Sequence, residues 1–175
     1  MDITNYLKAG YPLIYVCTQE ADRATRSIKA EGWKTYSWDC LRGITEPETG
    51  RTLEDVNDPL GALKWLNTKG DTILIAQNFH HFMASVEVIQ ETQNSLSIWK
   101  GQGSCLLMAG PRFNLPLELE KYFTLLDFAL PTPTDLFAGL VQQAVDQANK
   151  KRYTPNHGKP DQVKGLGKEV PDGTV

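Results

Sequence analysis

Short apolar runs alternate along this chain with segments of helical periodicity, and no other feature restricts the fold as strongly. Such runs suit strands that are buried on both faces, as they are in a parallel sheet. Helices must then connect the strands through right-handed crossovers. We therefore expect an α/β fold, a three-layer sandwich around a mostly parallel sheet of about five strands. The expected strands are residues 12–17, 33–38, 72–76, 104–109 and 123–128.

The segments between these runs carry helix signals. Thr18 is the expected N-cap of the first helix, and Asp58, followed by Pro59, is the expected N-cap of the second. A third helix is expected over 82–99, whereas the polar stretch 39–57 contains two turn signals and no expected strand. Apolar side chains at helical spacing define the faces that should pack on the sheet: Ala21, Ala24 and Ile28; Leu60, Leu63 and Leu66; Phe82, Val86, Ile89 and Leu96.

The chain is expected to divide near residue 150. A capping-box pattern at 132–135 predicts one more amphipathic helix within an α/β domain of residues 1–150. Residues 151–175 are polar and rich in glycine, proline and lysine, as a linker or tail would be. Residues 150–175 hold six basic and three acidic residues, so this end carries +3 and the rest carries −6 of the net −3. The acidic body argues against a nucleic-acid binder, which needs a clustered basic face.

Composition excludes several other classes. No apolar stretch approaches the length of a membrane-spanning helix, and the first residues do not have the pattern of a signal peptide, so we expect a cytoplasmic protein that does not enter a membrane. Cys17, Cys40 and Cys105 are far apart and form no C-x-x-C pair, and we expect buried free thiols.

Two loops at the carboxyl ends of the expected strands stand where a nucleotide would bind. After strand 12–17, a phosphate-binding loop would read G-x-x-x-x-G-K-S/T, but the sequence reads Cys17-Thr18-Gln19-Glu20. Glu20 would compete with an anion for the positive end of the helix. After strand 72–76, Gln77-Asn78 replaces the acids that would hold Mg²⁺ and polarise water.

Few other residues qualify as site residues. The candidates for a non-standard nucleotide pocket are Thr18, Arg42, His80 and Arg112, because arginines can hold phosphate without a P-loop. His80 and His81 have no third ligand nearby in sequence for zinc, and no nucleophile has an identifiable base partner.

Trp33 and Arg42 are candidates for a partner surface, where aromatic residues and arginine are favoured. The competing interpretations are local ones. Trp33 and Trp38 could form a tryptophan pair in the core, which is the favoured reading for Trp38. Arg42 could form an ion pair with Asp39.

Five blocks of the sequence together resemble a known family. They are "LKAGYPLIYVCTQEADR", "YSWDCLRGI", "DPLGALKWL", "ILIAQNFHHFM" and "LLMAGPRFNLPLELEKYFTLLDFALPTPTDL". Over about residues 5–145 they resemble the amino-terminal domain of AAA ATPases of the chloroplast and cyanobacterial hypothetical-reading-frame family. The resemblance implies a degenerate P-loop NTPase-like (RecA-like) domain that precedes a complete AAA+ module. The family usually has an acid before Phe79-His80, and Asn78 stands there.

The resemblance leads to one main hypothesis about function. We expect a catalytically silent P-loop-like N-terminal domain that acts as an adaptor, or as a regulatory or oligomerisation domain. Its partners would be its own AAA+ module, another protein, or further copies of itself in a homo-oligomer. No catalytic residue, cofactor or metal is assigned to this segment. ATP and Mg²⁺ would belong to an attached AAA+ module, which would make the full-length protein an ATPase.

Two alternatives remain open. The first is a nucleotide-binding ATPase or sensor that uses the non-standard pocket, and the second is a nucleic-acid adaptor that uses the basic tail. No AAA+ module follows within the 175 residues, so the chain is expected to be either a fragment or a stand-alone form of the front domain.

Overall fold

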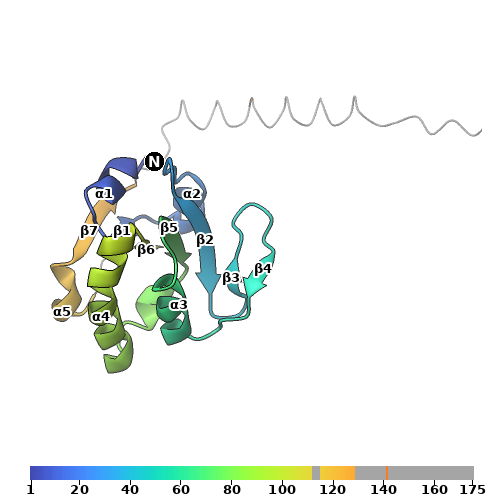
Figure 1. Ribbon diagram of the computed structural model, residues 1–175. Helices are drawn as coiled ribbons and strands as arrows, with labels where there is room; N and C mark the ends of the chain where they lie inside the picture. Colours follow the sequence, from blue (N-terminus) through green and yellow to red (C-terminus); the bar gives the residue numbers. More distant parts are fainter. Residues whose placement is uncertain (112–114, 129–140, 142–175) are drawn as a thin grey trace, which may run out of the picture. The chain divides into compact units, whose positions relative to one another are not determined.

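The computed structural model describes residues 1–111, 115–128 and Val141. All of these except Val141 belong to one compact unit, Met1–Leu130. Its strands form one sheet in the order β4-β3-β2-β5-β6-β1-β7 (Figure 1). The strands are β1 (Leu13–Cys17), β2 (Lys34–Asp39), β3 (Gly43–Thr45), β4 (Thr52–Glu54), β5 (Thr72–Ala76), β6 (Cys105–Gly110) and β7 (Phe123–Asp127). The helices are α1 (Thr4–Lys8), α2 (Ala21–Arg26), α3 (Pro59–Leu66), η1 (Phe79–His81), α4 (Val86–Gln102) and α5 (Leu117–Glu120).

The five expected strands are confirmed, and they form the parallel part of the sheet. In the order β2-β5-β6-β1-β7, each strand is parallel to its neighbours. The two central strands, β5 and β6, are buried at every residue. This explains why their sequences, TILIA and CLLMAG, show no polar alternation. A continuous apolar run was therefore a sound signal for these two strands.

Alternate side chains of the strands enter two separate cores, so the three-layer sandwich is also confirmed. On one face, Leu13 and Tyr15 of β1 pack with residues of α3, α4 and α5. On the other face, Ile14 and Val16 pack with Ile3, Leu7 and Ala24, from the segments around α1 and α2. Figure 1 shows α3 and α4 side by side in front of the sheet. Right-handed crossovers require this division, because the connection through α2 runs across the sheet in the opposite direction to the connections through α3, α4 and α5.

The stretch 39–57 contains two strands that sequence analysis missed. Strands β3 and β4 extend the sheet as an antiparallel hairpin beyond β2. Gly43 lies so close to β4 that a Cβ atom there would be 2.5 Å from the carbonyl oxygen of Glu54. Ile44 is fully buried, and the indole N–H of Trp38 donates a 2.7 Å hydrogen bond to the carbonyl oxygen of Val56. All three residues of β3 are buried, but only Ile44 is a large apolar residue, and β4 is exposed. This leaves little hydrophobic pattern, so the hairpin was not predicted.

The long helix begins later than expected, and one residue of its predicted core face is exposed. Residues 79–81 form a short 3-10 helix after Asn78, whose φ of 56° is left-handed, and α4 starts only at Val86. Val86 is 79% exposed, which contradicts its predicted core position. The inward residues of α4 are Val88, Thr92, Ser95 and Trp99. The other three predicted residues, Phe82, Ile89 and Leu96, are partly buried and pack against the same core. The stripe is therefore wrong only at Val86, the first residue of α4, because it was counted through the turn that precedes the helix.

Two predicted N-caps have different outcomes. Asp58 caps α3 as expected, since its carboxylate accepts a 2.6 Å hydrogen bond from the N–H of Gly61. Thr18 does not cap α2, whose N-cap residue is Glu20. The predicted helix after 132 and the expected boundary at residue 150 lie outside the described residues. All three cysteines are free thiols as expected, but only Cys105 is buried; Cys17 is half-buried, and the expected burial of Cys40 is wrong because its side chain is exposed. Within the described part of the chain, no helix is both long enough and apolar enough to cross a membrane.

Candidate functional site

The strand order places the candidate site at the carboxyl ends of β1 and β6. These strands are adjacent and parallel, but the connections that follow them run in opposite directions across the sheet. Ligands of open α/β sheets usually bind at such a switch point. The loops that border it are residues 18–20 after β1, residues 77–78 after β5, and Pro111 after β6.

The loop after β1 is held closed by its own hydrogen bonds. The N–H of Thr18 donates to the carbonyl oxygen of Gly110 at 2.8 Å, and the N–H of Glu20 donates to the hydroxyl of Thr18 at 3.0 Å. Two amides that could face a phosphate are therefore already engaged. The Glu20 carboxylate accepts 2.7 Å contacts from the Arg23 guanidinium, which also lies 4.4 Å from the ring centroid of Phe128. Helix α2 is only six residues long, and a carboxylate stands at its start.

The loop after β5 borders a very small cavity. The cavity has a volume of about 60 Å³ and is lined by Ala21, Asp22, Thr25, Ile75, Ala76, Gln77, Asn78 and Ala109. Pockets that hold drug-sized ligands measure roughly 300–1,000 Å³, whereas a water molecule in the liquid occupies about 30 Å³. The cavity therefore has room for about two waters and none for a nucleotide. Among the described residues, no group of three His, Cys, Asp or Glu side chains could hold a metal ion.

His80 lies beside the same strand ends. A Cβ atom on Gly110 would be 2.6 Å from the hydroxyl of Tyr15, so glycine leaves room for that buried ring, and 3.7 Å from Cε1 of His80, an ordinary contact distance. The His80 ring stacks on His81 with centroids 4.1 Å apart. Its Nδ1 atom is buried and has no hydrogen-bond partner in the part of the chain that the structure describes. Burial, and then the charge of His81, lowers the pKa of His80, which favours its neutral form.

The four pocket candidates do not all gather in one place. Thr18 and His80 both reach Gly110. Arg42 instead lines a groove of about 320 Å³ with Arg26, Glu46, Gln77 and others, and neither Thr18 nor His80 lines that groove. Arg112 lies outside the described residues.

Arg42 forms the local ion pair that was considered as its alternative role. Its Nε atom lies 2.7 Å from Oδ2 of Asp39, while Oδ1 of Asp39 accepts hydrogen bonds from the N–H groups of Leu41 and Arg42. Burial opposes the charged form of Asp39, but these hydrogen bonds outweigh it and lower the pKa. The Arg42 side chain is still 57% exposed, so a partner could reach it.

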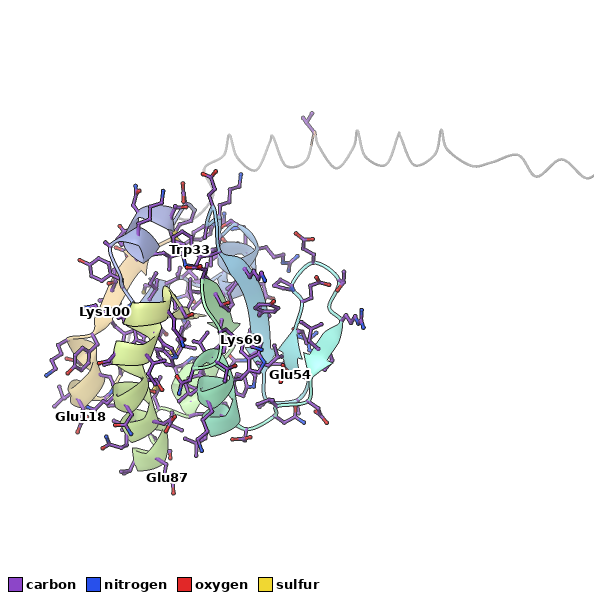
Figure 2. The ribbon with its side chains drawn as sticks, in the orientation of Figure 1. Trp33, Glu54, Lys69, Glu87, Lys100 and Glu118 are labelled. Atoms are coloured by element: carbon purple, nitrogen blue, oxygen red, sulfur yellow. The ribbon has the colours of Figure 1, made fainter. Side chains whose placement is uncertain are left out.

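The two tryptophans of the second expected strand differ. Trp38 is fully buried, as favoured from sequence, and its ring meets Phe79 and Phe82 edge to face. Trp33 is half-buried at the other end of β2 (Figure 2), and its indole N–H donates to the carbonyl oxygen of Gly103 at 2.6 Å. Trp33 also lines a groove of about 740 Å³ beside α2 and residues 46–48.

One concave region was missed by sequence reasoning, which considered only the carboxyl edge of the sheet. It lies at the amino ends of β1 and β7, between Tyr11, Lys100 and Lys121. The sequence signals for this groove were Gly10, which follows the short helix α1, and the lysines Lys100 and Lys121 in two distant segments. These residues do not predict a groove unless the fold that brings them together is known.

Comparisons with known proteins match most of the chain. The model of the SpoVK-like AAA ATPase N-terminal domain matches residues 1–128. The uncharacterized AAA domain-containing protein ycf46 of Trieres chinensis is 30% identical over 74% of this chain, and that of Pyropia yezoensis is 28% identical over 75%. The chain spans 28% of the length of each of these relatives. A chain from the structure of Drosophila ORC bound to AT-rich DNA and Cdc6 gives a TM-score of 0.42 at 15% identity, over 85% of this chain and 66% of that one, which is too distant to support an inference.

Proposed function

Because this chain belongs to the family of SpoVK-like AAA ATPase N-terminal domains, we propose that it serves such an ATPase as a domain that does not hydrolyse ATP itself and acts as an adaptor. The relatives are described as AAA domain-containing proteins, and this chain matches little more than a quarter of their length. ATP binding and hydrolysis with Mg²⁺ then belong to an attached AAA+ module, and this domain positions that module, docks a protein partner or joins copies of the chain.

The observation that carries the proposal is the closed loop after β1. Catalysis of phosphoryl transfer depends on donors and cations that surround the transferring group. Here the amides of Thr18 and Glu20 bond within the protein, Arg23 pairs with Glu20, and the cavity between the loops after β1 and β5 measures about 60 Å³. A larger hollow of about 660 Å³ beside Gln19 is lined by Glu20 and Asp22 together with Arg23 and Arg26, so it offers an anion no unopposed positive charge. Gln77 and Asn78 supply amide oxygens where a hard divalent cation would need carboxylates.

A second candidate function, a nucleotide sensor, has one observation in its favour. The backbone N–H of Thr18 and the ring of His80 both lie next to Gly110, and Gln77 lines both the small cavity and the groove of about 320 Å³ that contains Arg42. A nucleotide in that groove would have its phosphates near Arg42 and Arg26, beside the carboxylates of Asp22 and Glu46. These acids oppose an anion, so we rank the sensor second.

Isothermal titration calorimetry of the chain with ATP and Mg²⁺ separates the two candidates. The silent domain should give no saturable heat at micromolar ATP. The Glu20→Ala variant should behave in the same way, because removing the acid restores neither glycine amides nor a lysine. Micromolar binding by the unaltered chain would remove the observation on which the silent-domain proposal rests, namely the lack of a nucleotide site, and loss of that binding in Arg42→Ala would support the sensor.

A further inference from the structure

A groove of about 490 Å³ lies at the amino-terminal edge of the sheet, opposite the candidate nucleotide position. Three segments line it: the turn 9–12 between α1 and β1, one face of α4, and the turn 121–124 that leads into β7. The α4 residues are Gln93, Leu96, Ser97 and Lys100, which share a face by their helical spacing. We call this region the Lys100 groove.

The charge of the Lys100 groove has one sign. Lys100 and Lys121 are both exposed, and no aspartate or glutamate is among the described residues that line the groove. Neither lysine forms an ion pair within the described residues. In Figure 2, Lys100 lies toward the upper end of α4, while Glu118 of α5 lies lower. The groove therefore offers two unneutralised ammonium groups on a domain whose overall charge is negative.

The aromatic rim of the groove is fixed by the end of α1. The N–H of Tyr11 bonds to the carbonyl oxygen of Tyr6 and the N–H of Gly10 to that of Leu7, which together form a Schellman motif with Gly10 at φ 76°. The rings of Tyr6 and Tyr11 then pack edge to face, with centroids 6.2 Å apart. Tyr11 is 46% exposed, and the second rim residue, Tyr122, is 37% exposed with the Lys121 ammonium 4.8 Å from its ring centroid. Ordered tyrosines of this kind are favoured contact residues.

The floor of the groove explains a polar interruption in α4. Leu96 is half-buried there, with Gln93 and Ser97 beside it. Gln93 lies between Ile89 and Leu96 at helical spacing, and its amide donates to the carbonyl oxygen of Glu118 at 3.5 Å. An apolar patch flanked by hydrogen-bonding side chains suits a peptide, whose side chains need burial and whose backbone needs partners.

We propose that the Lys100 groove docks an acidic, extended peptide segment of a protein partner. Carboxylates of the peptide meet Lys100 and Lys121, and an apolar side chain lies over Leu96 between Tyr11 and Tyr122. Charge complementarity identifies the partner as acidic. Nucleic acid fits less well, because it requires a larger basic face than two lysines on an acidic body. This inference rests on the adaptor role proposed above and names its docking surface.

Fluorescence anisotropy with a labelled probe tests the proposal. The probe is a short fluorescein-labelled peptide of glutamates around one central leucine, and its neutral counterpart has glutamine in place of every glutamate. Saturable binding of the acidic probe should weaken at least about tenfold in the double variant Lys100→Glu/Lys121→Glu, since two attractive contacts become repulsive. Lys64→Glu on the exposed side of α3 is the matched control and should leave binding unchanged.

Several outcomes would overturn the docking surface. In the first, the acidic probe shows no saturable binding, and in the second, the neutral counterpart binds equally well. In the third, Lys64→Glu weakens binding as much as the double variant does. In the fourth, inorganic phosphate or an oligonucleotide displaces the probe at a lower concentration than the unlabelled peptide does. If the double variant does not fold, backbone NMR shifts of the unaltered chain decide, and they must change at Tyr11, Leu96 and Tyr122 on addition of the acidic peptide. None of these failures affects the ATP titration, so the silent-domain proposal is judged separately.

Discussion

Replacing Trp38 with alanine should destabilise the domain by about 3–5 kcal/mol, the usual cost of removing a large aromatic side chain from a core. Trp38 has no exposed surface, and its ring centroid lies 5.3 Å from that of Phe79 and 5.8 Å from that of Phe82. Its indole also bonds to Val56, in the segment that follows β4. The side chain therefore links β2, the turn after β5 and the hairpin. The loss would be a large share of the roughly 5–15 kcal/mol that stabilises a typical domain.

Urea unfolding followed by far-UV circular dichroism measures this cost without relying on tryptophan fluorescence, which the substitution itself changes. Trp38→Phe is the graded control and should lose about 1–3 kcal/mol, mainly from the hydrogen bond to Val56. Trp33→Ala, at the half-buried end of the same strand, should cost less than Trp38→Ala. If Trp38→Ala costs under about 1 kcal/mol, the hairpin is not part of the cooperative core, and the assignment of Trp38 to that core is wrong.

Three further predictions concern the turns. Gly43→Ala should cost about 2 kcal/mol or more in urea unfolding, because a Cβ atom would meet Glu54 at 2.5 Å and φ is 68°; an unchanged midpoint would contradict the hairpin geometry. Asp58→Ala should cost about 1 kcal/mol by removing the cap of α3, and Asp58→Asn should recover most of it. The pKa of His80 is lowered in the fold, so the unfolded chain binds its proton more readily and stability should fall as pH drops from 7 through about 6. His80→Gln should flatten this part of the pH profile, and an unaltered slope would exclude His80 as its source.

The parallel core could be predicted because burial on both faces leaves a plain signal in the sequence. The bounds of β5 were predicted residue for residue, and the other four parallel strands agree within one residue at each end. The hairpin β3–β4 could not be found in this way. All three residues of β4 are exposed, and the contacts of Gly43 are to backbone, which carries no sequence pattern.

The site was predicted only in outline. Sequence located the loops after β1 and β5 correctly, because the carboxyl ends of parallel strands share one edge. It could not show that Thr18 turns back onto Glu20 instead of capping α2, since the same residue types serve both roles. Of the expected stripe only Val86 is exposed, because the turn that begins at the left-handed Asn78 delays the start of α4, and the periodicity alone does not show where the helix begins.

The turn between β1 and α2 is short, and its length limits whether substitutions could turn it into a phosphate-binding loop. Strand β1 ends at Cys17 and α2 begins at Ala21, so only residues 18–20 separate them. A phosphate-binding loop places six residues, from its first to its second glycine, before the lysine. We therefore expect that substitutions of side chains alone would not let this turn wrap around a phosphate. A working loop would need inserted residues, and these would displace α2.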